Sequence, residues 1–154
     1  MIRVRALLLC LVALVAVTGC GSSPKQVTKA QYQVKLDTVG ADLGRAGSQV
    51  GKAIDIATFN RDVENFQTHL RDAAKELKGV KPPPNTQAAN MMLANAFHDL
   101  ADELEPVKDA RRESIVKARA ALLKVSKSQP IKAGRDAVKK LNRLGYDTAQ
   151  IASL

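Results

Sequence analysis

Few side chains in this sequence of 154 residues could carry acid–base, nucleophilic or metal chemistry. The chain has 2 His, 2 Cys and no Trp, and only 3% of it is aromatic. His69 lies near the edge of an apolar stripe, and His98 lies one helical turn before Asp102. A bound metal needs three or four converging ligands, and neither histidine has a second His or a Cys at ligand spacing. We therefore interpret both as surface polar residues and expect neither a metal nor another cofactor.

One short motif has the spacing of an activated nucleophile. Ser114-Ile115-Val116-Lys117 matches S-x-x-K, but the K-T-G that accompanies it in penicillin-recognising serine enzymes is missing. Neither G-x-S-x-G nor the phosphate-binding G-x-x-x-x-G-K-[ST] occurs. The sequence thus predicts that the protein is not an enzyme and has no catalytic residue. A hydrolase with an unrecognised site stays an alternative.

The first twenty residues have the pattern of an export signal. Arg3 and Arg5 precede an apolar run over 6–17, and small residues follow it. A positive start, a short apolar centre and small residues are typical of a secretory signal peptide. As a helix the run would span roughly 18 Å, which is too short for about 30 Å of hydrocarbon. We therefore expect a cleaved signal rather than a membrane-spanning anchor.

The end of this signal carries a residue that can be acylated. Val17, Thr18 and Gly19 lead directly into Cys20. This tetrapeptide resembles the lipobox of bacterial lipoproteins, which have a type II signal peptide. The resemblance implies diacylglyceryl transfer to the Cys20 sulfur, cleavage before Cys20, and in some members acylation of the freed amine. In the alternative reading, the protein is secreted in the ordinary way and Cys20 has no such role.

The domain organisation follows from that cleavage. We expect a signal peptide over 1–19, a lipidated Cys20 with a polar tether over 20–27, and one domain over 28–154. Cleavage would remove Cys10 and acylation would occupy Cys20, which leaves no thiol for a disulfide, a thiolate nucleophile or a zinc site. The tether over 21–27 reaches roughly 25 Å when stretched, so the domain would stay near the bilayer. The predicted location is the extracytoplasmic face of the cell membrane.

The remaining chain has helical periodicity throughout. A seven-residue repeat from residue 29 onward predicts a first helix, whose seam is Tyr32, Leu36, Val39, Leu43, Ala46, Val50, Ala53 and Ala57. Four glycines on a neighbouring face, Gly40, Gly44, Gly47 and Gly51, indicate close packing within the chain, a looser helix, or a ridge for a partner. A second stripe predicts a helix over 58–78 with Gly79 as its stop and Pro82-Pro83-Pro84 after it.

Three further stripes follow. The third runs from Ala89 to Val107 after a cap at Asn85 or Thr86, and Pro106 either kinks that helix or lies in the first turn of a new one. A fourth stripe begins at Ile115. The last begins after Ser128 and ends at Gly145 in a left-handed cap, with Tyr146 folding back on Leu141. Because no alternating β-branched run reaches strand length, we predict an all-α bundle of four to five helices with short connections.

Several of these features together resemble small helical lipoproteins of actinobacterial type. They are the end of the signal, the seam over 32–43, the stop over 77–83 and the ending Leu144-Gly145-Tyr146-Asp147. The resemblance implies a helical fold and a membrane-anchored, extracytoplasmic location. It carries over no active-site residue.

Positive charge is concentrated in the C-terminal third. Residues 108–143 hold twelve basic and three acidic side chains, a local charge of +9, whereas residues 21–107 hold ten basic and eleven acidic ones. Lys132, Arg135, Lys139 and Arg143 recur at helical spacing on one face, and Lys117, Lys124 and Lys127 lie opposite the apolar stripe of their helix. These seven residues predict a face that binds an anionic surface. Phospholipid and an anionic wall polymer both fit that chemistry, and a face that only maintains solubility is the alternative.

The sequence therefore predicts a lipid-anchored envelope lipoprotein with a non-enzymatic binding or scaffolding role at the membrane surface. The near absence of aromatic side chains to stack on bases argues against nucleic acid as a partner. Besides the hydrolase, the alternative function is a carrier that holds a small apolar ligand in the bundle interior. The sequence names no protein partner.

Overall fold

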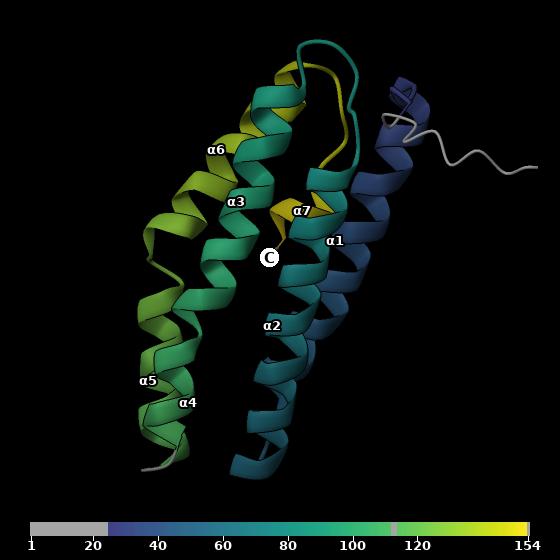
Figure 1. The fold of residues 1–154 in the computed structure, drawn as a ribbon. Helices are drawn as coiled ribbons and strands as arrows, with labels where there is room; N and C mark the ends of the chain where they lie inside the picture. The colour runs from purple at the N-terminus through teal and green to yellow at the C-terminus, as the bar shows by residue number, and fades with distance from the viewer. Residues whose placement is uncertain (1–24, 112–113, 154) are drawn as a thin grey trace, which may run out of the picture.

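The computed structural model describes residues 25–111 and 114–153, and this part of the chain is all-α (Figure 1). Six helices pack together, and a short seventh joins them. Their bounds are α1 Lys29–Lys52, α2 Ile56–Gly79, α3 Gln87–Glu103, α4 Glu105–Arg111, α5 Ile115–Val125, α6 Gln129–Arg143 and α7 Ala149–Ala152. The described residues contain no strand, and a single bridge pairs Gln26 with Lys81.

The all-α prediction is confirmed, but the predicted count of four to five helices is too low. Pro106 does not kink α3: that helix ends at Glu103, and α4 begins at Glu105 with the proline in its first turn. A proline there loses no hydrogen bond, because the first N–H groups of a helix have no partner within it. The other addition is α7, which the sequence analysis did not predict.

Side-chain caps set several helix starts. Thr28 and Gln31 form a reciprocal capping box at the start of α1. Asp55 caps α2 by accepting from the Thr58 N–H at 2.9 Å, so this helix begins at Ile56 rather than at residue 58. At α3, Thr86 occupies the cap position, but its hydroxyl donates to the Pro83 carbonyl instead.

The predicted end of α6 is confirmed. Gly145 is left-handed with φ 77°, which favours glycine because it lacks a Cβ. The Gly145 N–H donates to the Asn142 carbonyl at 2.9 Å, and the Tyr146 N–H donates to the Leu141 carbonyl at 3.2 Å. These two bonds define a Schellman motif. By contrast, Gly79 does not stop α2 in this way, since it is the last helical residue and Val80 is the cap.

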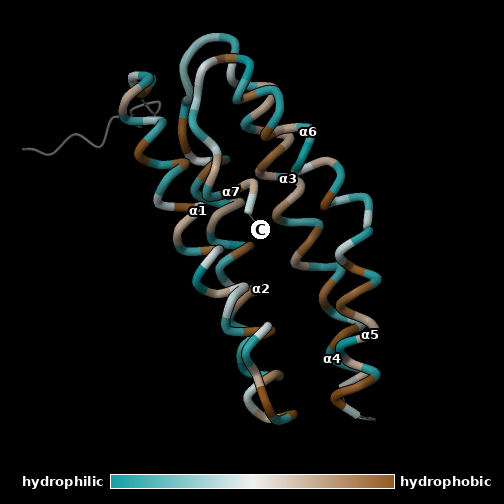
Figure 2. Tube along the Cα trace, turned by 180° about the vertical axis from the view of Figure 1, so that it is seen from behind, coloured by the Kyte–Doolittle hydropathy of each residue, from teal (hydrophilic) through white to brown (hydrophobic). Residues whose placement is uncertain are grey.

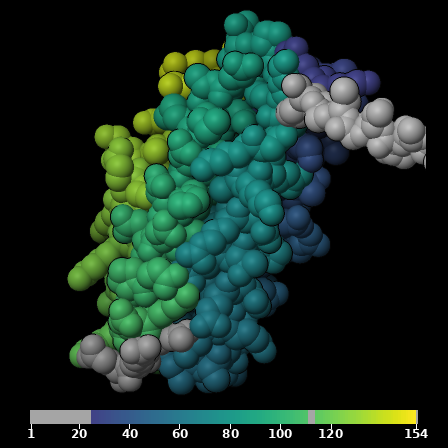
Figure 3. Space-filling view, viewed as in Figure 1, coloured from purple at the N-terminus to yellow at the C-terminus, as the bar shows by residue number. Residues whose placement is uncertain are grey.

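The helices are arranged as neighbours in a nearly closed ring. α2 packs against α1 and α3, and α3 packs against α6. α7 lies against α1 and touches α6, so it bridges the first and last long helices. α4 and α5 pack mainly on each other and extend the bundle at the end away from residue 25 (Figure 1). Viewed from the front, the side chains of α2 and α3 meet along most of the surface (Figure 3).

The predicted apolar stripes form the core, and Figure 2 shows apolar residues along the inner sides of the helices. Every residue of the first seam from Tyr32 to Ala53 is buried, whereas Ala57 is exposed because α1 ends at Lys52. Each core residue lies between Tyr32 and Ile151. The domain from residue 25 onward therefore carries its own hydrophobic core.

The four glycines of α1 do not form one contact ridge. A Cβ on Gly40 would lie 2.8 Å from Gln150 Cβ, so α7 packs directly on the helix there. A Cβ on Gly47 would meet Phe66 at an ordinary 3.5 Å, and Gly44 and Gly51 face open space. Close packing within the chain thus explains one position, and the ridge for a partner gains no support from the other three.

Candidate binding site: a basic face and an apolar cleft

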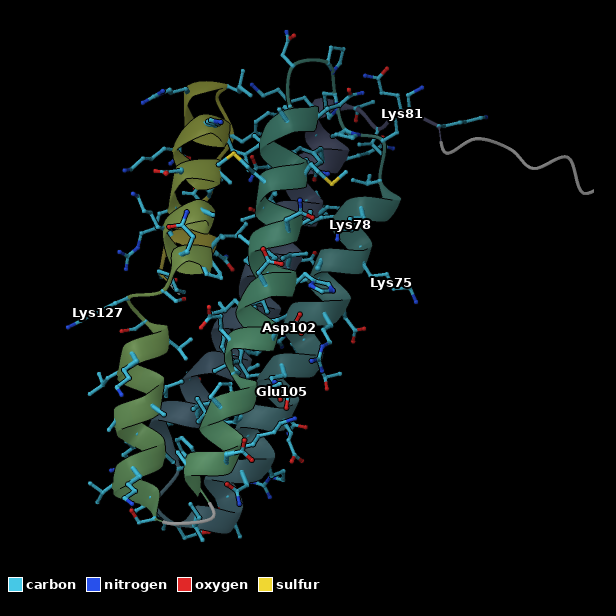
Figure 4. All side chains as sticks on the ribbon, turned by 60° about the vertical axis from the view of Figure 1, so that its left-hand side comes forward. Lys75, Lys78, Lys81, Asp102, Glu105 and Lys127 are labelled. Atoms are coloured by element: carbon cyan, nitrogen blue, oxygen red, sulfur yellow. The ribbon has the colours of Figure 1, made fainter. Side chains whose placement is uncertain are left out.

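The predicted basic residues lie on two consecutive helices and the turn between them. Lys117 and Lys124 are on α5, Lys127 is in the turn, and four more are on α6: Lys132, Arg135, Lys139 and Arg143. All seven are exposed. Lys127 projects from the turn away from the bundle, whereas Lys75 and Lys78 lie on α2 at the other side of the molecule (Figure 4). Helical spacing places the four α6 residues on one side of that helix.

Two aliphatic side chains accompany the cations of α5. Val116 is 72% exposed and Leu123 is 67% exposed. They are seven residues apart, which is nearly two full turns, so they lie on the same side of the helix. Lys117 and Lys124 are their immediate neighbours in sequence. We define Val116, Leu123, Lys117, Lys124 and Lys127 as the α5 outer face.

The exposure of Val116 and Leu123 could have been predicted from the helical periodicity of the sequence. The stripe that buries Ala118 and Val125 leaves Val116 and Leu123 on the opposite side of α5. An aliphatic residue at such a position is a departure from the usual amphipathic pattern, which places polar residues there. The predicted binding face was based on the basic residues alone.

An apolar cleft lies between α3, α6 and α7. It is half open and has a volume of about 330 Å³. α3 supplies Leu93, Ala96, Phe97 and Leu100, α6 supplies Pro130, Ile131, Gly134 and Val138, and Leu70 of α2 and Ile151 and Ala152 of α7 complete the apolar lining. Two of the predicted basic residues, Arg135 and Lys139, also line it.

Small residues bring α3 and α6 close together beside the cleft. Gly134 faces Ala96, and a Cβ on the glycine would lie 3.7 Å from the Ala96 Cβ, which is an ordinary contact distance. α7 is only four residues long, so it covers little of the gap beside α6. A carrier was one of the functions that the sequence left open, but the residues of this cleft could not be predicted from it.

A buried polar cluster between α1 and α3 is structural. The Tyr32 hydroxyl donates to Asn90 Oδ1 at 2.9 Å, and Asn90 Nδ2 donates to the Leu77 carbonyl at 2.8 Å. The ring of Tyr146 meets that of Tyr32 edge-on, with 5.2 Å between centroids. Burial, and secondly the charge interaction with Tyr146, raises the pKa of Tyr32 well above its ordinary value. The Tyr32 hydroxyl therefore stays neutral and joins α1 to α3.

The charged groups of α3 and α4 form a surface network. Arg71 Nη2 donates to Asp102 and Glu105 at 3.2 and 3.3 Å, and Lys108 donates to Glu105 at 3.1 Å. The hydrogen bond from Lys108, then the one from Gln67, lowers the pKa of Glu105. Figure 4 shows Asp102 and Glu105 on one exposed side of the bundle. This network links α2 to α3 and α4.

Both histidines lie at the surface, as predicted. His98 Nδ1 is 3.4 Å from Asp102 Oδ2 at the surface. His69 is exposed beside a polar groove between α1 and α2 that Asp42, Arg45 and Asp62 also line. In the described ranges no hydrogen bond joins His69 to either carboxylate, and no group of His, Cys, Asp and Glu could hold a metal ion.

The S-x-x-K motif has a structural explanation. Ser114 is the N-cap of α5, and its hydroxyl accepts from the Lys117 N–H at 3.2 Å. This contact uses the backbone of Lys117, which any residue would supply. The spacing that resembles a nucleophile is therefore also the spacing of a helix cap.

The predicted lipidation site lies outside the described residues. Val17, Thr18, Gly19 and Cys20 belong to that part of the chain, as does the whole signal peptide. Within residues 25–111 and 114–153, no helix combines the length and the apolar character that crossing a bilayer requires.

Comparisons with known proteins add no family. No protein-family model, curated protein or solved structure matches the chain.

Proposed function

We propose that this protein is a lipid-anchored envelope lipoprotein that binds the anionic surface of its own membrane through the α5 outer face. Its role is binding rather than catalysis, and its location is the extracytoplasmic face of the cell membrane. The lipobox-like sequence that ends at Cys20 supports the proposed anchor, and the exposed pair Val116 and Leu123 among lysines supports the proposed contact.

The aliphatic pair favours phospholipid over a wall polymer. A polyanionic polymer would pair with the cations but gives no reason to expose two aliphatic side chains. A bilayer surface accommodates both, because apolar groups enter the acyl boundary while lysines stay at the headgroups. Each basic residue near such a surface contributes about 1 kcal/mol, and full burial of a Val or Leu side chain contributes about 1.5–3 kcal/mol.

The position of α5 fits a second attachment point. The described chain begins at residue 25 near one end of the bundle, and α5 lies at the other end (Figure 1). α2 alone has 24 residues, and so many residues span roughly 36 Å at 1.5 Å each. An anchor before residue 25 and a contact at α5 would lay the bundle along the bilayer rather than let it stand upright.

Sedimentation with vesicles tests the contact. Residues 21–154, which lack Cys20, should sediment with phosphatidylglycerol vesicles at low salt and stay in solution with phosphatidylcholine vesicles. The charge reversal K124E/K127E should abolish sedimentation. K75E/K78E is the matched control, because it makes the same change of charge at exposed α2 positions. Equal binding to both lipids, or equal effects of the two variants, would overturn the proposed contact.

Mass spectrometry of the membrane fraction from the native host tests the anchor separately. The expected amino-terminal peptide begins at Cys20 and carries a diacylglyceryl group. An unmodified Cys20 in a protein that washes into the medium would overturn the anchor. That result would leave the vesicle experiment unaffected, because its protein lacks Cys20.

A second candidate function is a carrier of a small apolar ligand, and the cleft between α3, α6 and α7 favours it. Its volume of about 330 Å³ lies at the lower end of the roughly 300–1,000 Å³ of ligand pockets. A carrier function is compatible with membrane binding, since a protein held at the bilayer would meet such ligands there.

A further inference from the structure

We infer that the cleft binds an amphipathic anion with a single hydrocarbon chain, with the chain inside the cleft and the head group at Arg135 and Lys139. The head group is a carboxylate or a phosphate, which both pair with these cations. This inference deepens the carrier function. It depends neither on the lipid anchor nor on the α5 outer face.

The lining of the cleft selects a hydrocarbon chain. Its walls are aliphatic apart from Phe97, and no uncharged polar side chain lines it. A ligand with several hydroxyl or amide groups would leave them without partners inside, which disfavours sugars, nucleosides and peptides. The cleft volume of about 330 Å³ is that of a small ligand pocket.

The charges at the rim select an anionic head group. Arg135 and Lys139 are four residues apart on α6 and both line the cleft, so their side chains lie one turn apart at the same opening. Among the described residues Arg135 has no ion-pair partner. Lys139 pairs weakly with Asp136, at 3.7 Å. The two cations thus have one carboxylate partner between them, which leaves a net positive charge for a ligand.

The half-open form of the cleft fits a ligand whose head group stays in contact with solvent. A wholly enclosed cavity would suit a neutral hydrocarbon, because nothing polar could reach water. Here both cations are exposed, so a bound head group would keep part of its hydration while the chain loses contact with water. A ligand of this kind avoids the cost of burying a charge.

Calorimetric titration of residues 21–154 with three ligands of one chain length tests the inference. Laurate and lauryl phosphate should bind, and lauryl alcohol should bind more weakly than either. Comparing laurate with lauryl phosphate distinguishes a fatty-acid site from a phospholipid-type site. Shortening laurate to decanoate and octanoate should weaken binding about threefold to fourfold for each methylene removed.

Two variants separate the head-group contact from the chain contact. R135Q/K139Q should weaken laurate binding by up to about thirtyfold and leave lauryl alcohol unchanged, because exposed ion pairs contribute up to about fivefold each. K132Q/R143Q, on the same side of α6 but outside the cleft lining, is the matched control. A152F should weaken all three ligands, since Ala152 is exposed and lines the cleft.

Two results would overturn the inference, and one variant separates it from the proposed membrane contact. Failure of laurate and lauryl phosphate to bind, or equal effects of R135Q/K139Q and K132Q/R143Q, would overturn the inference. Circular dichroism of each variant tests whether the fold is intact. K124E/K127E should keep laurate binding while it loses vesicle binding, so failure of the cleft and failure of the α5 outer face are distinguishable.

Discussion

The Tyr32 hydroxyl donates a 2.9 Å hydrogen bond to Asn90 Oδ1, and this bond joins α1 to α3 inside the core. Both side chains are buried, Tyr32 completely and Asn90 to 3% exposure. The Asn90 amide nitrogen donates to the Leu77 carbonyl. The Tyr32 hydroxyl is therefore the hydrogen-bond donor for the Asn90 side-chain oxygen.

We predict that Tyr32→Phe lowers the free energy of unfolding by about 1–3 kcal/mol, because it leaves Asn90 Oδ1 buried without a donor. Urea denaturation followed by circular dichroism measures the change. Tyr146→Phe is the control, since among the described residues the Tyr146 hydroxyl has no protein partner. It should change stability by less than about 0.5 kcal/mol. Equal effects of the two substitutions would contradict the role of the hydrogen bond.

Two glycines of α1 should respond in opposite directions to alanine. Gly44→Ala should stabilise the protein by about 0.5–1 kcal/mol, because its Cβ would meet open space and alanine is the better helix former. Gly40→Ala should destabilise it, because the new Cβ would lie 2.8 Å from Gln150 Cβ and displace α7. Thermal unfolding of both variants provides the measurement. A stabilising Gly40→Ala would mean that α7 does not pack closely on α1.

Acid should weaken the start of α2. The hydrogen bond from the Thr58 N–H, and then the one from the Thr58 hydroxyl, lowers the pKa of Asp55. Since the folded pKa lies below the unfolded value of about 3.9, the contribution of this carboxylate is full above about pH 5 and is lost as the pH falls through the folded pKa.

Asp55→Asn isolates this effect, because asparagine also caps helices but does not titrate. The free energy of unfolding of the variant should fall less steeply than that of the parent between about pH 5 and pH 2. Denaturation in urea at a series of pH values measures both slopes. Parallel slopes would show that Asp55 does not titrate differently in the folded and unfolded states.

Substitution of the aliphatic pair of α5 should affect binding to a bilayer but not binding to a soluble anionic polymer. V116S/L123S should weaken binding to phosphatidylglycerol vesicles by at least about tenfold, because two partly inserted side chains are lost. Binding to a soluble polyphosphate should not change. V34S/M91S, which alters two exposed apolar residues on α1 and α3, is the control. A loss of polyphosphate binding that equals the loss of vesicle binding would contradict insertion of Val116 and Leu123.

The sequence predicted the parts of the fold that periodicity encodes. The long stripes of α2 and α3, for example Leu70 and Leu93, repeat often enough to indicate which side is buried. The Gly145 cap was predictable because it depends on one residue's backbone freedom and on the nearby chain. For Pro106 the sequence left two alternatives open, since both satisfy the same local constraint.

The rest depended on contacts between distant segments. α7 is four residues long, too short for any periodicity, and it is held by its packing on Gly40. The cleft is lined by residues of α2, α3, α6 and α7, and no one of these segments alone indicates a cavity. The basic residues of α6 were predicted as a face, but only the packing of α3, α6 and α7 brings Arg135 and Lys139 to an apolar opening.

α7 forms one wall of the cleft, but it packs mainly on α1. Gln33 of α1 exchanges two hydrogen bonds with the backbone of Asp147, at 2.8 and 2.9 Å, and α7 touches α6 only slightly. The border between α6 and α7 is therefore a less closely packed side of the cleft than the border between α3 and α6.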